Sequence, residues 1–153
     1  MQPEEYNFAC NCRVKANCPP EGKCLTPNIV YRADICDLTN NENKFYIGLA
    51  ETTFKERYNN HKRDIKHENY KNNTELTKHI WNLNNQNHSY SIHWKMISKI
   101  YGNANKRMCN LCASEKLKII ESIDDVNLLN KRSEFISKCR HINSVALVWL
   151  LWL

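Results

Sequence analysis

Glycine is scarce in this chain, with only three among 153 residues. Loops that cradle nucleotide phosphates need several glycines close together, so the sequence excludes such a loop. The most apolar run, Val145 to Leu153, has nine residues, whereas a membrane-spanning helix needs about 20. We therefore expect no contact with a membrane. We interpret this run as a strand or helix tail that docks on the core, or as an accident of truncation.

A secretion signal is also lacking. The chain begins with the acidic segment Met1-Gln2-Pro3-Glu4-Glu5, which contains no apolar core. We therefore expect an intracellular protein whose thiols are reduced. Eight cysteines are many for this length, and clustered cysteines in a reducing compartment more often bind a metal than form disulfides.

The rest of the composition is that of an ordinary globular domain. Hydrophobic residues make up 42% of the chain and charged residues 25%, enough for one modest core. Lys and Arg number 22 against 16 Asp and Glu, which gives a net charge of +6. This excess favours a polyanionic partner, although many functions are compatible with it.

Residues 28–50 predict a β-hairpin. The first strand, residues 28–36, alternates between two faces, as a half-buried strand does. The apolar positions of one face are Ile29, Tyr31, Ala33 and Ile35. Turn-forming residues follow over 37–43, and residues 44–49 predict the second strand.

Residues 53–100 predict two helices and a third strand. The first helix runs from Thr53 to near Tyr70, and its apolar stripe has helical spacing. The stripe consists of Phe54, Tyr58, His61 and Ile65. Thr74 is a suitable N-cap for a second helix that ends at Asn84-Asn85. Residues 89–100 alternate again and predict the third strand.

A third helix is expected after a basic loop over residues 103–107, with one face formed by Ala113, Leu117 and Ile120. One or two further helical turns are expected over 133–139. The predicted fold class is α+β, a small, mainly antiparallel three-stranded sheet flanked by helices. We divide the chain into a cysteine-rich leader (1–27), a main domain (28–141) and an apolar tail (142–153).

Several residues with chemical potential are distributed over these elements. The hairpin carries Asn28-Ile29-Val30-Tyr31 on its first strand and Tyr46-Ile47-Gly48 on its second. Arg57 and His61 are four residues apart, so they share one face of the first helix. Two further polar residues lie downstream, Glu75 in the first turn of the second helix and Asn130 in a late loop.

This combination resembles the GIY-YIG endonuclease family, and the resemblance covers about residues 28–132. The family signature is a hydrophobic-Tyr strand, a Tyr-Ile-Gly strand ten to fifteen residues later, an Arg-x3-His helix and a distant Glu. Asn28 stands where the signature has its first glycine, and Val30 is the middle residue. The tyrosine that carries the chemical role, Tyr31, is retained.

The resemblance implies a metal-dependent DNA endonuclease that hydrolyses phosphodiester bonds. Mg²⁺ prefers oxygen ligands and keeps several waters, so one carboxylate can suffice, and Glu75 is the candidate. Arg57 can bind the scissile phosphate with its planar guanidinium. Tyr31 is then the base that takes a proton from the attacking water, for which it needs nearby positive charge. By the same resemblance, Tyr46 and His61 place the water and the phosphate. Asn130 supplies an amide that has a structural role or contacts the phosphate.

The cysteine pattern narrows the resemblance to the endonuclease domain of Penelope-like retroelements, which couple it to a reverse transcriptase. That resemblance implies that DNA is the substrate and that the location is nuclear. It also implies a possible partner, a reverse-transcriptase domain that this chain does not contain. Zinc is the expected structural metal because it takes four thiolate or imidazole ligands. The candidate ligands are Cys12, Cys18, Cys24, Cys109, Cys112, Cys139 and His141. Our preferred grouping joins the first three to one ligand from the region of Cys109 or Cys139.

Each of these residues also has an ordinary structural explanation. Tyrosines are common in strands, a helix dipole favours Glu75 at its position, and Cys36 fits a buried apolar thiol. Basic residues lie near the motifs along the chain, where they favour phosphate contacts without sequence specificity. They are Lys55, Lys62, Arg63, Lys66, Lys106, Arg107, Lys131 and Arg132. Two other functions stay open, a zinc-stabilised nucleic-acid-binding module without catalysis and a redox or metal-buffering protein.

Overall fold

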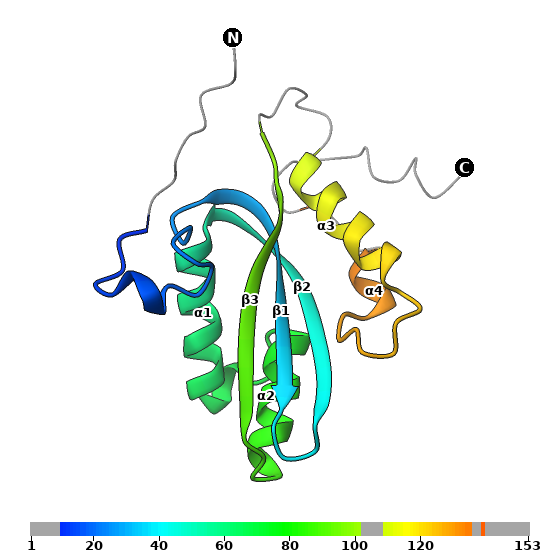
Figure 1. The fold of residues 1–153 in the computed structure, drawn as a ribbon. Coiled ribbons are helices and arrows are strands. Elements are labelled where there is room, and N and C mark those ends of the chain that lie inside the picture. The colour runs from blue at the N-terminus through cyan, green and yellow to red at the C-terminus, as the bar shows by residue number, and fades with distance from the viewer. Residues whose placement is uncertain (1–9, 102–108, 136–138, 140–153) are drawn as a thin grey trace.

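The computed structural model describes residues 10–101, 109–135 and 139 (Figure 1). The main elements are β1 (Pro27–Asp37), β2 (Glu42–Thr53), α1 (Phe54–Lys66), α2 (Glu75–Asn85), β3 (Tyr90–Lys99), α3 (Asn110–Glu121) and α4 (Arg132–Phe135). There are also two short 3-10 helices in the described residues: η1 (Lys15–Asn17) precedes β1, and η2 (Glu68–Tyr70) lies between α1 and α2. The predicted α+β class, with a three-stranded antiparallel sheet flanked by helices, is confirmed.

The sheet has the order β2-β1-β3, so the first strand is central and both of its pairings are antiparallel. In this register Tyr31 lies opposite Gly48 on β2 and Met96 on β3. Asn28, where the family signature has glycine, has a φ of 51°. Asn adopts this left-handed conformation more readily than most residues other than glycine.

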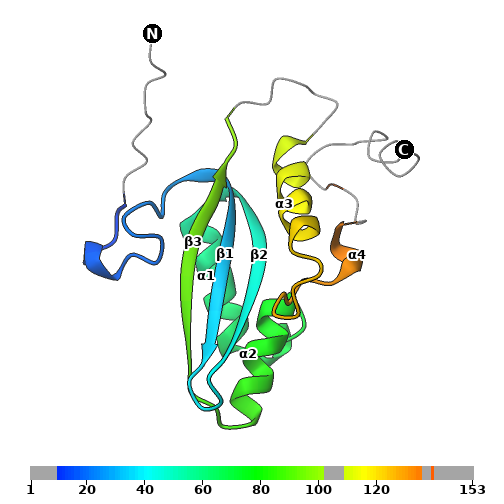
Figure 2. The same ribbon diagram turned by 45° about the vertical axis from the view of Figure 1, so that its right-hand side comes forward.

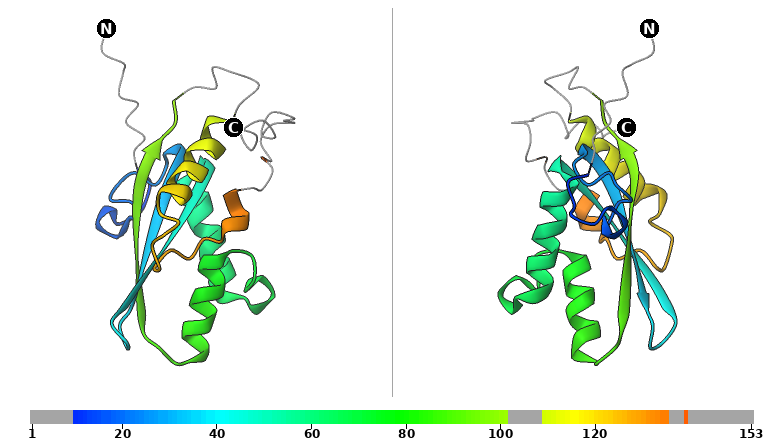
Figure 3. Two further views of the ribbon diagram at one scale, coloured as in Figure 1. Left: turned by 90° about the vertical axis from the view of Figure 1, so that its right-hand side faces the viewer. Right: turned by 60° about the vertical axis from the view of Figure 1, so that its left-hand side comes forward.

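Helices cover both faces of the sheet (Figures 1 and 3). The face of β1 predicted to be apolar packs with residues of α1 and α2, and Trp94 of β3 completes that core. The opposite face carries a smaller core in which α3 covers β1 and β2, as Figure 2 shows from the side. This second cover explains why Val30, expected on a half-exposed face, is completely buried.

The ends of α1 and α2 follow from local hydrogen bonds. The Thr53 hydroxyl accepts a bond from the Glu56 amide at 3.3 Å, and the Thr74 hydroxyl accepts one from the Thr77 amide at 3.1 Å. Thr74 is therefore the N-cap that the sequence predicted. The expectation that the first helix reaches Tyr70 is wrong, because it ends at Lys66 and the separate turn η2 follows.

The predicted buried face of α3 is also wrong. Leu117 and Ile120 are 54% and 49% exposed. The side chains that α3 buries are Leu111, Cys112 and Ile119. Apolar residues occur on more than one side of this helix, so spacing alone could not decide which side meets the sheet.

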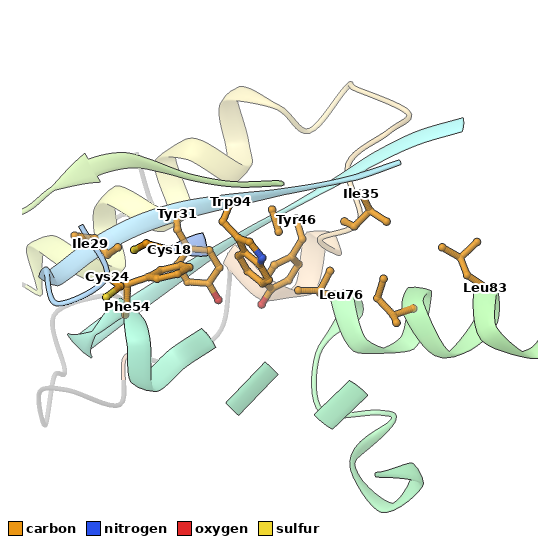
Figure 4. Close-up of a cluster of buried hydrophobic side chains, with 13 residues drawn as sticks. Cys18, Cys24, Ile29, Tyr31, Ile35, Tyr46, Phe54, Leu76, Leu83 and Trp94 are labelled. Carbon is orange, nitrogen blue, oxygen red and sulfur yellow. The ribbon is translucent and has the colours of Figure 1, made fainter. Parts of the chain in front are cut away.

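The described part of the leader, residues 10–26, is attached to the start of α1. The Thr26 and Cys24 carbonyls accept hydrogen bonds from the Phe54 and Lys55 amides at 3.1 and 2.8 Å. Cys18 and Cys24 pack into the larger core (Figure 4). The predicted apolar tail (142–153) lies outside the described residues. Within the part of the chain that the structure describes, no helix combines the length and apolarity that crossing a membrane requires.

Candidate functional site

Tyr31, His61 and Arg57 form a hydrogen-bonded group between β1 and α1. The Tyr31 Oη lies 2.6 Å from His61 Nε2 and accepts a bond from Arg57 Nε at 3.3 Å. Tyr31 and His61 are 0% and 1% exposed. Arg57 and His61 reach the same phenol because they are one helical turn apart, as the sequence spacing predicted.

Gly48 leaves the space that the Tyr31 ring occupies. A Cβ at this position would lie 2.6 Å from Tyr31 Cζ and would overlap its hydroxyl oxygen. It would also lie 3.0 Å from a ring carbon of Tyr46. The glycine of Tyr-Ile-Gly is therefore needed for the close approach of two phenols, one from each hairpin strand.

A cavity of about 710 Å³ lies beside this group. Tyr46 and Arg57 line it, together with Glu115 and Lys116 of α3 and Glu134 of α4. The Tyr31 and Tyr46 side chains leave the sheet on the same side, and their hydroxyl groups point away from it (Figure 4). Glu51 of β2 lines it as well, so the cavity combines a phenol, two cations and three carboxylates.

Burial and the Arg57 charge set the protonation of the buried groups. Burial raises the pKa of Tyr31, and Arg57 lowers it only in part. Burial also raises the pKa of Tyr46 well above its ordinary value, with a further rise from the Tyr31 phenol. For His61, burial followed by the Arg57 charge lowers the pKa to about 3. The imidazole is therefore neutral at physiological pH.

The neutral imidazole of His61 carries its proton on one of its two ring nitrogens, Nδ1 or Nε2. Among the described residues no partner lies within hydrogen-bonding reach of His61 Nδ1. A buried N–H without an acceptor is costly, so we assign the proton to Nε2, where it is donated to Tyr31. The Tyr31 oxygen then accepts two hydrogen bonds, from His61 and from Arg57. Both favour the ionised form of the phenol.

Glu75, the carboxylate expected to bind Mg²⁺, does not line this cavity. Its Oε1 lies 2.8 Å from Lys78 Nζ and 3.4 Å from Lys131 Nζ. It faces a separate depression of about 500 Å³. The cavity carboxylates are Glu51, Glu115 and Glu134, which sequence reasoning missed. Burial raises the pKa of Glu134, and the neighbouring Glu75 adds to the rise.

Asn130 contacts the backbone of the Tyr-Ile-Gly strand. Its Oδ1 accepts a hydrogen bond from the Ile47 amide, and its Nδ2 donates to the Ile47 carbonyl, each at 2.8 Å. The same Nδ2 donates to Glu134. Nearby, Phe45 exchanges bonds with the backbone of residues 127 and 129. This segment covers the outer edge of β2, and Asn130 holds one cavity carboxylate beside it.

The eight cysteines, all within the described residues, form no disulfide. Seven of them gather in two groups in which the sulfur atoms lie within 4.8 Å of one another. The first cysteine group consists of Cys10, Cys12, Cys18 and Cys24, and the second consists of Cys109, Cys112 and Cys139. Cys36 belongs to neither.

This arrangement corrects the preferred grouping of zinc ligands. Cys10 completes the first group, and no ligand is shared between the two regions. A tetrahedral zinc ion with bonds of about 2.3 Å holds sulfur atoms about 3.8 Å apart. The Cys12 and Cys24 sulfurs are 3.7 Å apart, and those of Cys112 and Cys139 are 3.2 Å apart. Both groups could therefore hold a metal such as zinc. His141 lies outside the described residues.

The basic residues predicted around the site are distributed unevenly. Arg63 pairs with Asp64, and Lys131 with Glu75. Lys62, Lys66 and Arg132 are exposed and Lys55 is half-buried. Lys106 and Arg107 lie outside the described residues. The cation that sequence reasoning missed is Lys116, which lines the cavity one position after Glu115.

Comparisons with known proteins do not identify a family: no family model matches the sequence, and neither the curated proteins nor the solved structures gave a match.

Proposed function

We propose that this protein is a metal-dependent DNA endonuclease that hydrolyses phosphodiester bonds, as the resemblance to GIY-YIG domains implies. The observation that carries the proposal is the position of Arg57. Its guanidinium lines the cavity and donates to the phenol of Tyr31. Burial opposes its charge, but the Tyr31 and Tyr46 phenols outweigh burial and raise the pKa of Arg57. A permanent, partly desolvated cation beside two phenols suits the anionic transition state of phosphoryl transfer.

The donors of the cavity fit Mg²⁺. Carboxylate oxygens are its preferred protein ligands, and substrate phosphate and water complete its coordination. We assign the main ligand to Glu115 in place of Glu75. The charges of Glu134 and Glu115 both act on Tyr46, and only that of Glu115 is among those that also raise the pKa of Tyr31. The bound ion would neutralise phosphate charge and lower the pKa of a bound water.

The two phenols have different roles in this proposal. Tyr31 accepts hydrogen bonds from Arg57 and His61 and is the more readily ionised phenol, so we retain it as the base. Tyr46 lines the cavity and positions the attacking water. His61 stays neutral and orients the Tyr31 hydroxyl. Lys116, beside the catalytic carboxylate, contacts the DNA backbone without reading its sequence.

The two cysteine groups have a structural role in the proposal, each holding one zinc ion. The leader contains one 3-10 turn in its described part and little regular structure besides. Four thiolates around one ion would supply the free energy that orders it, because binding to a site absent from the unfolded chain stabilises the fold.

Nicking of supercoiled plasmid in the presence of Mg²⁺ tests this function. Glu115→Gln should reduce the nicking rate by about 100-fold or more. Glu121→Gln, on the same helix but outside the cavity lining, is the matched control and should nick normally. Glu75→Gln should also retain most activity. If Glu75→Gln is inactive and Glu115→Gln is active, our assignment of the metal ligand is wrong.

Arg57→Ala separates catalysis from DNA binding. It should suppress nicking much more than affinity for DNA, because the guanidinium acts mainly on the transition state. Equal losses of both would contradict that role. A wild-type protein that binds DNA but never nicks it with Mg²⁺ or Mn²⁺ would instead be a zinc-stabilised binding module.

A further inference from the structure

The second cysteine group joins two of the segments that carry cavity carboxylates, α3 with Glu115 and the segment around α4 with Glu134. Cys112 is one helical turn before Glu115 on α3, and both residues line the cavity. Cys139 comes five residues after Glu134 and also lines the cavity. Because the sulfurs of Cys112 and Cys139 are 3.2 Å apart, the connection between the segments lies at the cavity wall itself.

Cys109 fixes the start of the same helix. It is the N-cap of α3, and its sulfur accepts a hydrogen bond from the Cys112 amide at 3.4 Å. On the outer face of α3, Leu117 and Ile120 are about half exposed and bury little apolar surface that could hold the helix. Its attachment therefore depends on a short buried stripe and on the cysteines at its start.

Besides the backbone bonds of residues 127 and 129 to Phe45, the segment around α4 has one attachment on each side of the helix. At one end Asn130 binds the Ile47 backbone, and beyond α4 Cys139 meets the other two thiols. The helix itself has only four residues, too few to be stable without tertiary contacts. The position of Glu134 is therefore set from both sides, by an amide and by a thiol.

We propose that the second cysteine group binds one zinc ion that fastens α3 to the segment around α4 and so positions Glu115 and Glu134 for Mg²⁺. This inference rests on the proposed function for the identity of the cavity metal. The cysteines are positioning residues, because they act on the substrate only through the carboxylates. The first cysteine group, which orders the leader at the start of α1, has no such connection to the carboxylates.

The test measures zinc content, Mn²⁺ binding and nicking on the same preparations. Mn²⁺, detected by electron paramagnetic resonance, is the probe for the cavity, and Glu115→Gln identifies its site by abolishing the binding. Wild-type protein should hold two zinc ions. Cys139→Ser should hold one and should bind Mn²⁺ about 10- to 100-fold more weakly, the usual cost of removing the support of a metal ligand. Its nicking rate should fall by a similar factor.

Two further variants make the test specific. Cys139→His keeps a zinc ligand and should restore both the second zinc ion and the Mn²⁺ affinity. If Cys139→Ser does not fold, the Mn²⁺ affinity of Cys139→His with and without its second zinc ion measures the effect of the zinc instead. Cys36→Ser, outside both groups, should behave as the wild type. The proposal is overturned if the wild type holds only one zinc ion, or if Cys139→Ser loses its zinc and still binds Mn²⁺ normally.

The same data distinguish this proposal from the proposed function. If Mn²⁺ affinity depends on Cys139 but no variant nicks DNA, the zinc ion positions the carboxylates and the endonuclease function is wrong. If the wild type nicks and Cys139→Ser, with one zinc ion, nicks equally fast, the endonuclease function stands and the positioning role fails.

Discussion

Acid should destabilise this protein through His61, which is buried without charge. Burial and Arg57 lower the pKa of this imidazole to about 3 in the folded state, whereas an unfolded histidine titrates near 6.5. Above about pH 6.5 both states are neutral at this residue and its contribution to stability is complete. As the pH falls toward 3, His61 becomes protonated in the unfolded chain but not in the folded protein, so the free energy of unfolding decreases.

The size of the effect follows from these two pKa values. Between pH 8 and pH 5 the linkage relation gives a loss of about 2 kcal/mol, and its limiting slope is about 1.4 kcal/mol per pH unit. The assay is urea denaturation of the wild type and of His61→Gln at pH 8, 7, 6 and 5 with saturating zinc. Loss of zinc from thiolates also weakens the fold in acid, but it affects both proteins, so the difference between their curves isolates His61.

His61→Gln should be less stable than the wild type at pH 8, and this difference should shrink by about 2 kcal/mol at pH 5. His61→Phe, which also cannot titrate, serves if the Gln variant does not fold. Curves that stay parallel from pH 8 to pH 5 would refute the reasoning, because they would show that the buried imidazole titrates as it does in the unfolded chain.

Two further predictions concern the Tyr-Ile-Gly strand. Gly48→Ala should lower the free energy of unfolding by about 1–3 kcal/mol, since the new methyl group overlaps the buried Tyr31 ring; urea denaturation measures the loss, and an unchanged midpoint would show that the ring moves aside freely. Asn130→Ala should cost about 2–4 kcal/mol, since it leaves the buried amide and carbonyl of Ile47 without partners. Asn130→Asp keeps the acceptor for the Ile47 amide and loses the donor to the Ile47 carbonyl. If both bonds matter equally, its free energy of unfolding should lie halfway between those of the wild type and Asn130→Ala.

The hairpin and its buried face were predictable because the relevant signals are local. Strand alternation placed Tyr31 on the buried face, turn residues set the hairpin, and Thr74 marked the start of α2. The helix spacing of Arg57 and His61 likewise predicted that both side chains point the same way. In each case the decisive geometry is a property of one element or of two elements joined by a short turn.

The carboxylate side of the cavity could not be predicted in the same way, because its geometry depends on packing between distant segments. Glu75 satisfies every local criterion, a helix start and a position soon after the Arg-x3-His helix, yet two lysines bind it outside the cavity. Glu115 enters the cavity only because α3 packs across β1 and β2 through Leu111 and Ile119. That packing was the step that helical periodicity decided wrongly.

One sequence signal does indicate the observed orientation of α3. Cys109, Cys112 and Glu115 follow one another at intervals of three residues, so each lies about one turn before the next in a stripe that winds along the first turns of α3. If the two cysteines bind a metal, this stripe must face the remaining ligands, whatever the apolar residues of the helix suggest. The third sulfur, Cys139, lies at the cavity wall, and the stripe therefore carries Glu115 toward Arg57 and the two phenols. In this chain the cysteine spacing was the better guide to the orientation of α3, because a cluster of sulfur ligands specifies direction while scattered apolar residues do not.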